Sequence, residues 1–186
     1  MSDNVNEYPI VESSESSLGT KTAQPQILIH RIKTLFSVAS DETFEEGMDS
    51  HFSKSLTSII EQYGDTAVAV SSDISVRPET NSEVAYEAMR LFGRIDHLST
   101  HKKRMGALIR GLQHPLPRVR DGAALGLASM DDPQAIPALR EAIQQEPCEE
   151  LREDMEQANP DHGRGSTVPG GYTSDKSDRR QALFGL

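Results

Sequence analysis

The sequence is poor in the residues that carry redox chemistry and base stacking. Its 186 residues contain no tryptophan, a single cysteine and only 5% aromatic residues. One thiol excludes an internal disulfide, and no Cys-x-x-Cys pair occurs, so a reducing compartment is expected. Cys148 is followed by two glutamates whose charge disfavours the thiolate, which predicts an inert thiol.

Long apolar runs and nucleotide-binding loops are also missing. No stretch of about 18 apolar residues is present, so no membrane span is predicted. The first residues lack the basic patch and apolar run of a secretory signal. Walker loops, Gly-x-Gly-x-x-Gly, Gly-x-Ser-x-Gly and zinc spacings do not occur. We therefore expect a cytoplasmic protein that binds no cofactor.

Polar, interrupted segments lie at both ends of the chain. Residues 1–24 are rich in Ser, Glu, Asn and Thr, and residues 159–186 carry Pro or Gly every few positions. Such segments bury too little apolar surface to offset the entropy of ordering. The sequence predicts disordered tails at 1–24 and 159–186 around a helical domain at 25–158.

Between these tails, apolar residues recur at helical spacing. Steps of three and four run from Phe44 to Tyr63, after a capping box formed by Thr43 and Glu46, and Gly64 is a natural stop. Residues 65–75 fit a helix or a strand, and helix is favoured because every neighbour is helical. The other predicted helices are 27–36, 80–95 with a capping box from Thr80 to Glu83, 101–112, 117–130, 134–146 and 148–158.

An internal repeat links two of these helices. The stretch from Glu83 superposes on the stretch from Arg118 at an offset of 35 residues. A period in the thirties with two helices per unit predicts an α-solenoid of stacked helical hairpins. The matched apolar pairs are Val84 with Val119, Ala88 with Ala123, Phe92 with Leu127, Ile95 with Met130, and Leu108 with Leu139 after a shorter loop.

Two runs within this region resemble a known family. Val-Arg-x-x-Ala-Ala-x-x-Leu at 119–127 and Asp-Pro-x-Ala-Ile-Pro-x-Leu at 132–139 are similar to HEAT repeats, in particular the short bacterial type named after phycobilisome lyases. The resemblance covers 105–147 well and 81–104 moderately. It implies the all-α, HEAT-like fold of stacked hairpins and little about function.

Charge is divided unevenly along the predicted solenoid. From Arg90 to Arg120 there are eight basic residues and one acidic residue, whereas Asp121 to Ala158 holds ten acidic and two basic residues. Such polarity favours electrostatic steering of a protein partner, although a solvated face with internal ion pairs has the same composition. The candidate partner-binding residues are Lys102, Lys103, Arg104, Arg110, Arg118 and Arg120.

Other candidate sites are weaker. The same bases would suit nucleic-acid phosphates, but the net charge of −10 and the absence of tryptophan argue against that partner. His97 and His101 stand four residues apart, yet no third metal ligand has a suitable spacing. The acidic run at 149–156 is interpreted as the wet face of a terminal helix. A candidate C-terminal docking motif comprises Arg179, Arg180, Leu183, Phe184 and Leu186.

These observations favour a non-catalytic interaction module, a scaffold or adaptor. It would bind another protein in a groove lined by helices such as 101–113 and 134–146, without metal or cofactor. The alternative is a phycobilin lyase-like or chaperone subunit that acts on a pigment protein. That alternative depends only on the resemblance to the lyase type of HEAT repeat.

Overall fold

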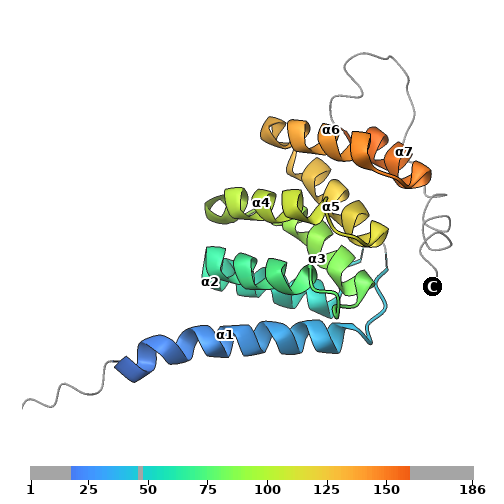
Figure 1. Cartoon of the computed structure of the whole chain (residues 1–186). Helices are drawn as coiled ribbons and strands as arrows, with labels where there is room; N and C mark the ends of the chain where they lie inside the picture. Colours follow the sequence, from blue (N-terminus) through green and yellow to red (C-terminus); the bar gives the residue numbers. More distant parts are fainter. Residues whose placement is uncertain (1–17, 46–47, 160–186) are drawn as a thin grey trace, which may run out of the picture.

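The chain is a stack of helices, described by a computed structural model over residues 18–45 and 48–159 (Figure 1). Throughout these residues the secondary structure is helical, which confirms the predicted all-α class and the helical interpretation of 65–75. The elements are α1 (Leu18–Ala39), α2 (His51–Ser75), α3 (Ser82–Arg94), the 3-10 turn η1 (Leu98–Thr100), α4 (His101–Gly111), α5 (Pro117–Met130), the turn η2 (Pro133–Ala135), α6 (Ile136–Gln145) and α7 (Glu149–Ala158).

The helices are arranged in two stacked columns, as the solenoid prediction requires. Figure 1 shows α4 between α2 and α6 along one side, with α3 and α5 on the other side and α1 beneath α2. The most extensive packing joins α3 to α5, and α7 covers α5 and α6 at the far end. α1 begins at Leu18, so its first turns lie inside the segment 1–24 that the composition had assigned to a tail.

The start of α2 corrects the predicted capping box at Thr43 and Glu46. The helix begins at His51, and the Ser50 hydroxyl accepts a hydrogen bond from the Ser53 N–H at 2.9 Å. The carboxylate of Glu42 accepts hydrogen bonds from the N–H groups of the first two residues of the helix, His51 at 2.6 Å and Phe52 at 3.1 Å. The free donors of the first turn are thus satisfied from a preceding coil, which local spacing does not reveal.

Gly64 interrupts α2 but does not end it. Its φ of 55° and ψ of −136° lie outside the helical region, and helix resumes directly through residues 65–75. Glycine suits this position because a side chain with positive φ would be strained. The predicted stop is therefore a sharp break between an N-terminal half, 51–63, and a C-terminal half, 65–75.

The caps of the later helices are largely as expected. Pro117 is the first residue of α5, and the Asp132 carboxylate accepts the Gln134 N–H at 2.8 Å. At α3, however, the cap is Asn81 rather than Thr80, since the Asn81 side chain accepts the Glu83 N–H at 2.8 Å. The Glu83 carboxylate consequently takes no part in a capping box and remains available for a longer contact.

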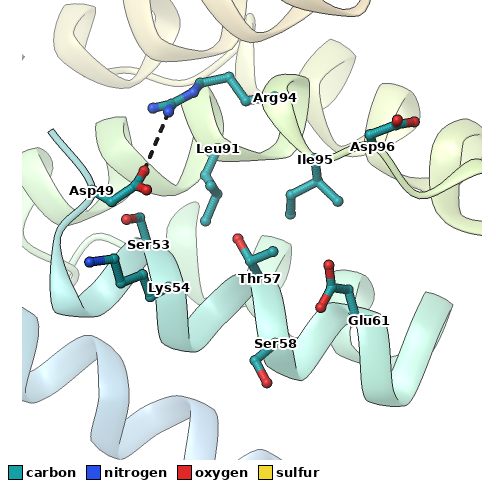
Figure 2. Close-up of a pocket in the computed structure, with 10 residues that line it drawn as sticks. All are labelled: Asp49, Ser53, Lys54, Thr57, Ser58, Glu61, Leu91, Arg94, Ile95 and Asp96. Carbon is teal, nitrogen blue, oxygen red and sulfur yellow. Dashed lines mark ion pairs between the residues drawn. The ribbon is translucent and has the colours of Figure 1, made fainter. Parts of the chain in front are cut away.

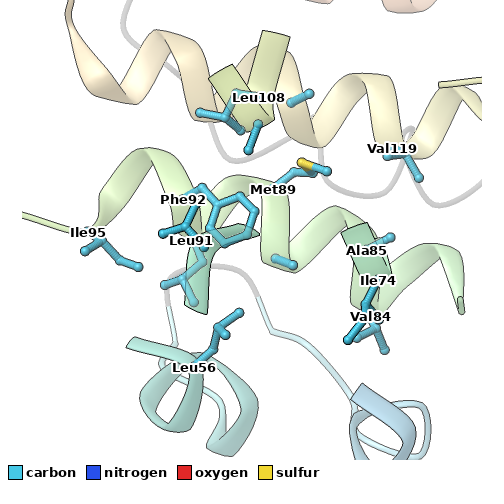
Figure 3. Close-up of a cluster of buried hydrophobic side chains, with 14 of the residues drawn as sticks. Leu56, Ile74, Val84, Ala85, Met89, Leu91, Phe92, Ile95, Leu108 and Val119 are labelled. Atoms are coloured by element: carbon cyan, nitrogen blue, oxygen red, sulfur yellow. The ribbon is translucent and has the colours of Figure 1, made fainter. Parts of the chain in front are cut away.

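The core confirms the repeat offset and shows what holds α3 against α5. The paired positions Val84 and Val119 are 0% and 1% exposed. A Cβ on Gly93 would lie 2.0 Å from the carbonyl oxygen of Gly126, so the two backbones touch where these glycines face each other. Figure 3 shows the apolar side chains of α3 held between Leu56 of α2 and Leu108 of α4.

Candidate functional site: the exposed face of α4

The exposed face of α4 carries positive charge and no negative charge. Helical spacing buries Leu108 and Gly111 against α3 and α5 and turns the opposite side to solvent. The helix contains no acidic residue. The exposed residues, which we call the basic stripe, are Lys102, Lys103 and Arg110, with Gly106 and Gln113 on the same face.

The three cations of the basic stripe differ in how they are held. Arg110 reaches across to α2, where it donates to the Ser72 hydroxyl at 2.7 Å and lies 3.7 Å from the Asp73 carboxylate. That ion pair is open to solvent, so it contributes little to stability. Lys102 and Lys103 form no ion pair with any residue that the structure describes. Their charge is therefore presented to solvent.

Arg104 is a correction to the predicted partner-binding set. Its side chain is 2% exposed, although it follows two exposed lysines. The guanidinium donates to the carbonyl oxygens of Phe92 and of His97, the latter at 3.2 Å, and to the Thr100 hydroxyl at 3.1 Å. Burial lowers the pKa of Arg104. Its function is to join the start of α4 to the end of α3.

Arg118 is committed to a second internal contact. Its guanidinium makes two hydrogen bonds to the Glu83 carboxylate, at 2.8 and 2.6 Å, and lies 3.5 Å from the centre of the Tyr86 ring. Burial alone would lower the pKa of Arg118, but the bonded Glu83 raises it. The residue thus connects the first turns of α3 and α5 and does not belong to an exposed basic surface.

Arg120 is the third cation that the structure places inside. It makes two hydrogen bonds to Glu146, at 2.7 and 2.6 Å, and donates to the carbonyl of His114 at 2.8 Å. Burial lowers the pKa of His114, whose Nδ1 accepts the Leu116 N–H at 3.1 Å. Three of the six candidate cations are consequently structural, and the others form the basic stripe.

The paired histidines are engaged in separate contacts. His97 Nδ1 lies 3.1 Å from the Thr100 hydroxyl, and His101 Nε2 lies 2.7 Å from the Asp132 carboxylate. Among the described residues, no three His, Cys, Asp or Glu side chains are grouped in a way that would hold a metal ion. The candidate motif at 179–186 lies outside the described residues.

A polar hollow between α2 and α3 was not anticipated from the sequence. Figure 2 shows Arg94 of α3 reaching toward Asp49, with the two charged groups 3.6 Å apart at one end of the hollow. The cavity measures about 370 Å³ and is open to solvent. It mixes acidic, basic and hydroxyl side chains from two separate segments, so no sequence motif marks it. Its other lining residues are Ser53, Lys54, Thr57, Ser58, Glu61, Leu91, Ile95 and Asp96.

Comparison with known proteins identifies the repeats. Residues 74–158 match the family model described as HEAT repeats, which confirms the resemblance and covers the last two residues of α2 and all later helices. The searches of curated proteins and of solved structures gave no match. None of the described helices has the length and apolar composition needed to cross a membrane.

Proposed function

We propose that this HEAT-repeat protein is a non-enzymatic interaction module that binds another protein along the side formed by α2, α4 and α6. HEAT repeats generally mediate contacts between proteins. The observation that carries the proposal is the basic stripe, where Lys102 and Lys103 have no ionic partner among the described residues. Exposed, unpaired charge of one sign increases the rate of encounter with a partner of opposite charge.

The titratable groups with shifted pKa values support an adaptor rather than an enzyme. Such groups often mark active sites, where they meet in a cleft. Here Glu87 is 4% exposed within α3, and Glu146 is 5% exposed and bonded to Arg120. Neither lines the hollow between α2 and α3.

We further propose that the module works in the cytoplasm, which the lone thiol favours.

Site-specific crosslinking tests this function without presupposing the chemistry of the partner. A photoreactive residue would replace exposed Gln113 on the α4 face, with exposed Glu153 on α7 as the matched control. After irradiation in native lysate, we expect a discrete adduct from position 113 and none from position 153. Equal adducts from both positions, or none from 113, would overturn the proposal. A shifted visible absorbance after mixing with a bilin would instead favour the pigment-related alternative.

A further inference from the structure

We infer that the face of α4 binds an acidic α-helix of the partner, which crosses α4 closely at Gly106. This inference rests on the proposed function and adds the chemistry and the position of the contact. It follows from an unexplained glycine, from the placement of bases around it, and from the charges at both edges of the face.

Gly106 has no packing reason to be glycine. A Cβ added there would meet nothing within 4 Å, although the residue lies in the exposed middle of a helix. Glycine weakens a helix interior because it loses the most backbone freedom on folding. The contrast within this chain is direct: a Cβ would clash at 2.0 Å on Gly93, 2.7 Å on Gly122 and 2.6 Å on Gly126.

The same chain shows what glycines on a helix face permit. Where Gly93 of α3 meets Gly126 of α5, the missing side chains let two helix backbones come into contact. Gly106 offers the same bare backbone to solvent on α4. An occupant whose own backbone approaches closely, as a helix with a small central residue does, gives this glycine a function.

Bases bracket the bare position along the helix. Lys102 lies four residues before Gly106 and Arg110 lies four residues after it, so each is about one turn, or about 6 Å of rise, away on the same face. Lys103 adds a second charge at the N-terminal side. A crossing helix with carboxylates on both sides of a small residue would meet these cations.

Acidic groups at the edges favour a protein helix over nucleic acid. Asp73 of α2 lies 3.7 Å from Arg110, and Asp132 lies 2.7 Å from His101 at the other edge of α4. The positive surface therefore has a carboxylate on each side. A nucleic-acid backbone, which carries phosphates continuously, would meet these acids as well. A helix with one narrow acidic stripe would not.

Fluorescence anisotropy with the full-length protein tests the inference. The probe is a labelled amphipathic peptide of about 20 residues, with glutamates four positions before and after a central alanine; such a length supports a helix. A scrambled peptide of the same composition and a single-stranded RNA serve as comparators. We expect the amphipathic peptide with its glutamates in these positions, called the ordered peptide below, to bind most tightly.

Two variants separate the bare backbone from the charge. Gly106→Leu should lower the affinity for the ordered peptide about tenfold, while Thr34→Leu, on the exposed side of α1, should leave it unchanged. The double variant Lys102→Glu with Lys103→Glu should lower this affinity at least as much, and Lys33→Glu should leave it unchanged. Thermal midpoints no lower than that of the unaltered protein would show that Gly106→Leu still folds.

The outcomes distinguish this inference from the proposed function. If both peptides and the RNA bind equally and Gly106→Leu changes nothing, the face of α4 is a general anion-binding surface and the inference is wrong. If no peptide binds while position 113 still gives its adduct, the interaction function stands without the acidic helix. If position 113 gives no adduct, both the proposed function and this inference are wrong.

Discussion

Glu83 and Arg118 occupy equivalent positions in successive repeats and are bonded to each other. They stand 35 residues apart, the repeat offset itself, and their side chains make hydrogen bonds of 2.8 and 2.6 Å. The pair is 21% and 12% exposed on Glu83 and Arg118, so it is only partly screened by water. The equivalent position is thus acidic in one repeat and basic in the next, and the bond between the two side chains fixes how α5 stacks on α3.

The first prediction concerns this bond. Arg118→Met should lower the free energy of unfolding by about 2 kcal/mol, between the values for exposed and fully buried ion pairs. Urea denaturation monitored by circular dichroism measures the change. Arg77→Met is the control, because its pair with Glu79 is 45% and 71% exposed, and it should cost less than about 0.5 kcal/mol. Equal effects from the two variants would show that the bond between the repeats contributes no more than a surface pair.

The second prediction sets two glycines against each other. Gly126→Ala should destabilise the protein by about 3 kcal/mol, because the new Cβ would lie 2.6 Å from the backbone oxygen of Met89. Gly106→Ala should instead stabilise it by about 0.5–1 kcal/mol, since the added methyl group meets open space. Thermal and urea unfolding of both variants checks the opposite signs. A destabilising Gly106→Ala would mean that the position has an internal role.

Local patterns predicted most of the fold because they act over a few residues. Pro117 and Asp132 mark helix starts through their own backbone and side-chain geometry, and both lie where expected. The start of α2 was missed because Glu42 satisfies the first N–H groups of the helix from a coil nine and ten residues away. Phe44, predicted as helical, packs from that coil edge-on against Phe52. Such contacts are tertiary and leave no spacing to recognise.

Burial of charge was the main limit on predicting the site. Lys103 and Arg104 are adjacent in the sequence, yet one is exposed and the other is 2% exposed. A helix turns about 100° per residue, so neighbours face opposite environments, and composition alone does not assign them. The repeat offset contained a usable signal for Arg118, because it aligned this base with the acid Glu83.

The third prediction concerns acid stability through Glu146. Burial would raise the pKa of this carboxyl, but the hydrogen bonds from Arg120 and from the Cys148 N–H lower it below its ordinary value of 4.5. A lowered folded pKa gives stability that is present above the unfolded pKa and is lost as pH falls through the folded pKa. Glu146→Gln should therefore be less stable at pH 7 by about 3 kcal/mol, because Arg120 is left buried without its counter-charge. Its unfolding free energy should also depend less on pH between 5 and 3.

The fourth prediction concerns Glu87, whose pKa is shifted in the opposite direction to that of Glu146. Burial raises the pKa of Glu87, although Arg90, Arg94 and Arg118 oppose the shift. A raised folded pKa gives a contribution that is complete below the unfolded pKa and is lost as pH rises through the folded pKa. Glu87→Gln should hence stabilise the protein at pH 7, and the gain should shrink in acid. Urea titrations at pH 7 and pH 4 measure it; a gain that grows in acid would contradict the assigned cause.

The fifth prediction concerns the mode of action of the two unpaired lysines. If Lys102 and Lys103 attract an acidic helix before contact, they act mainly on the association rate, and salt screens them over about 10 Å at 0.1 M. Stopped-flow mixing with the ordered acidic peptide should show a rate that falls steeply with added salt. Lys102→Glu with Lys103→Glu should lower that rate at low salt and flatten its salt dependence. An unchanged association rate with faster dissociation would mean that the lysines act only after docking, as contacts in the bound complex rather than as the field that guides it there.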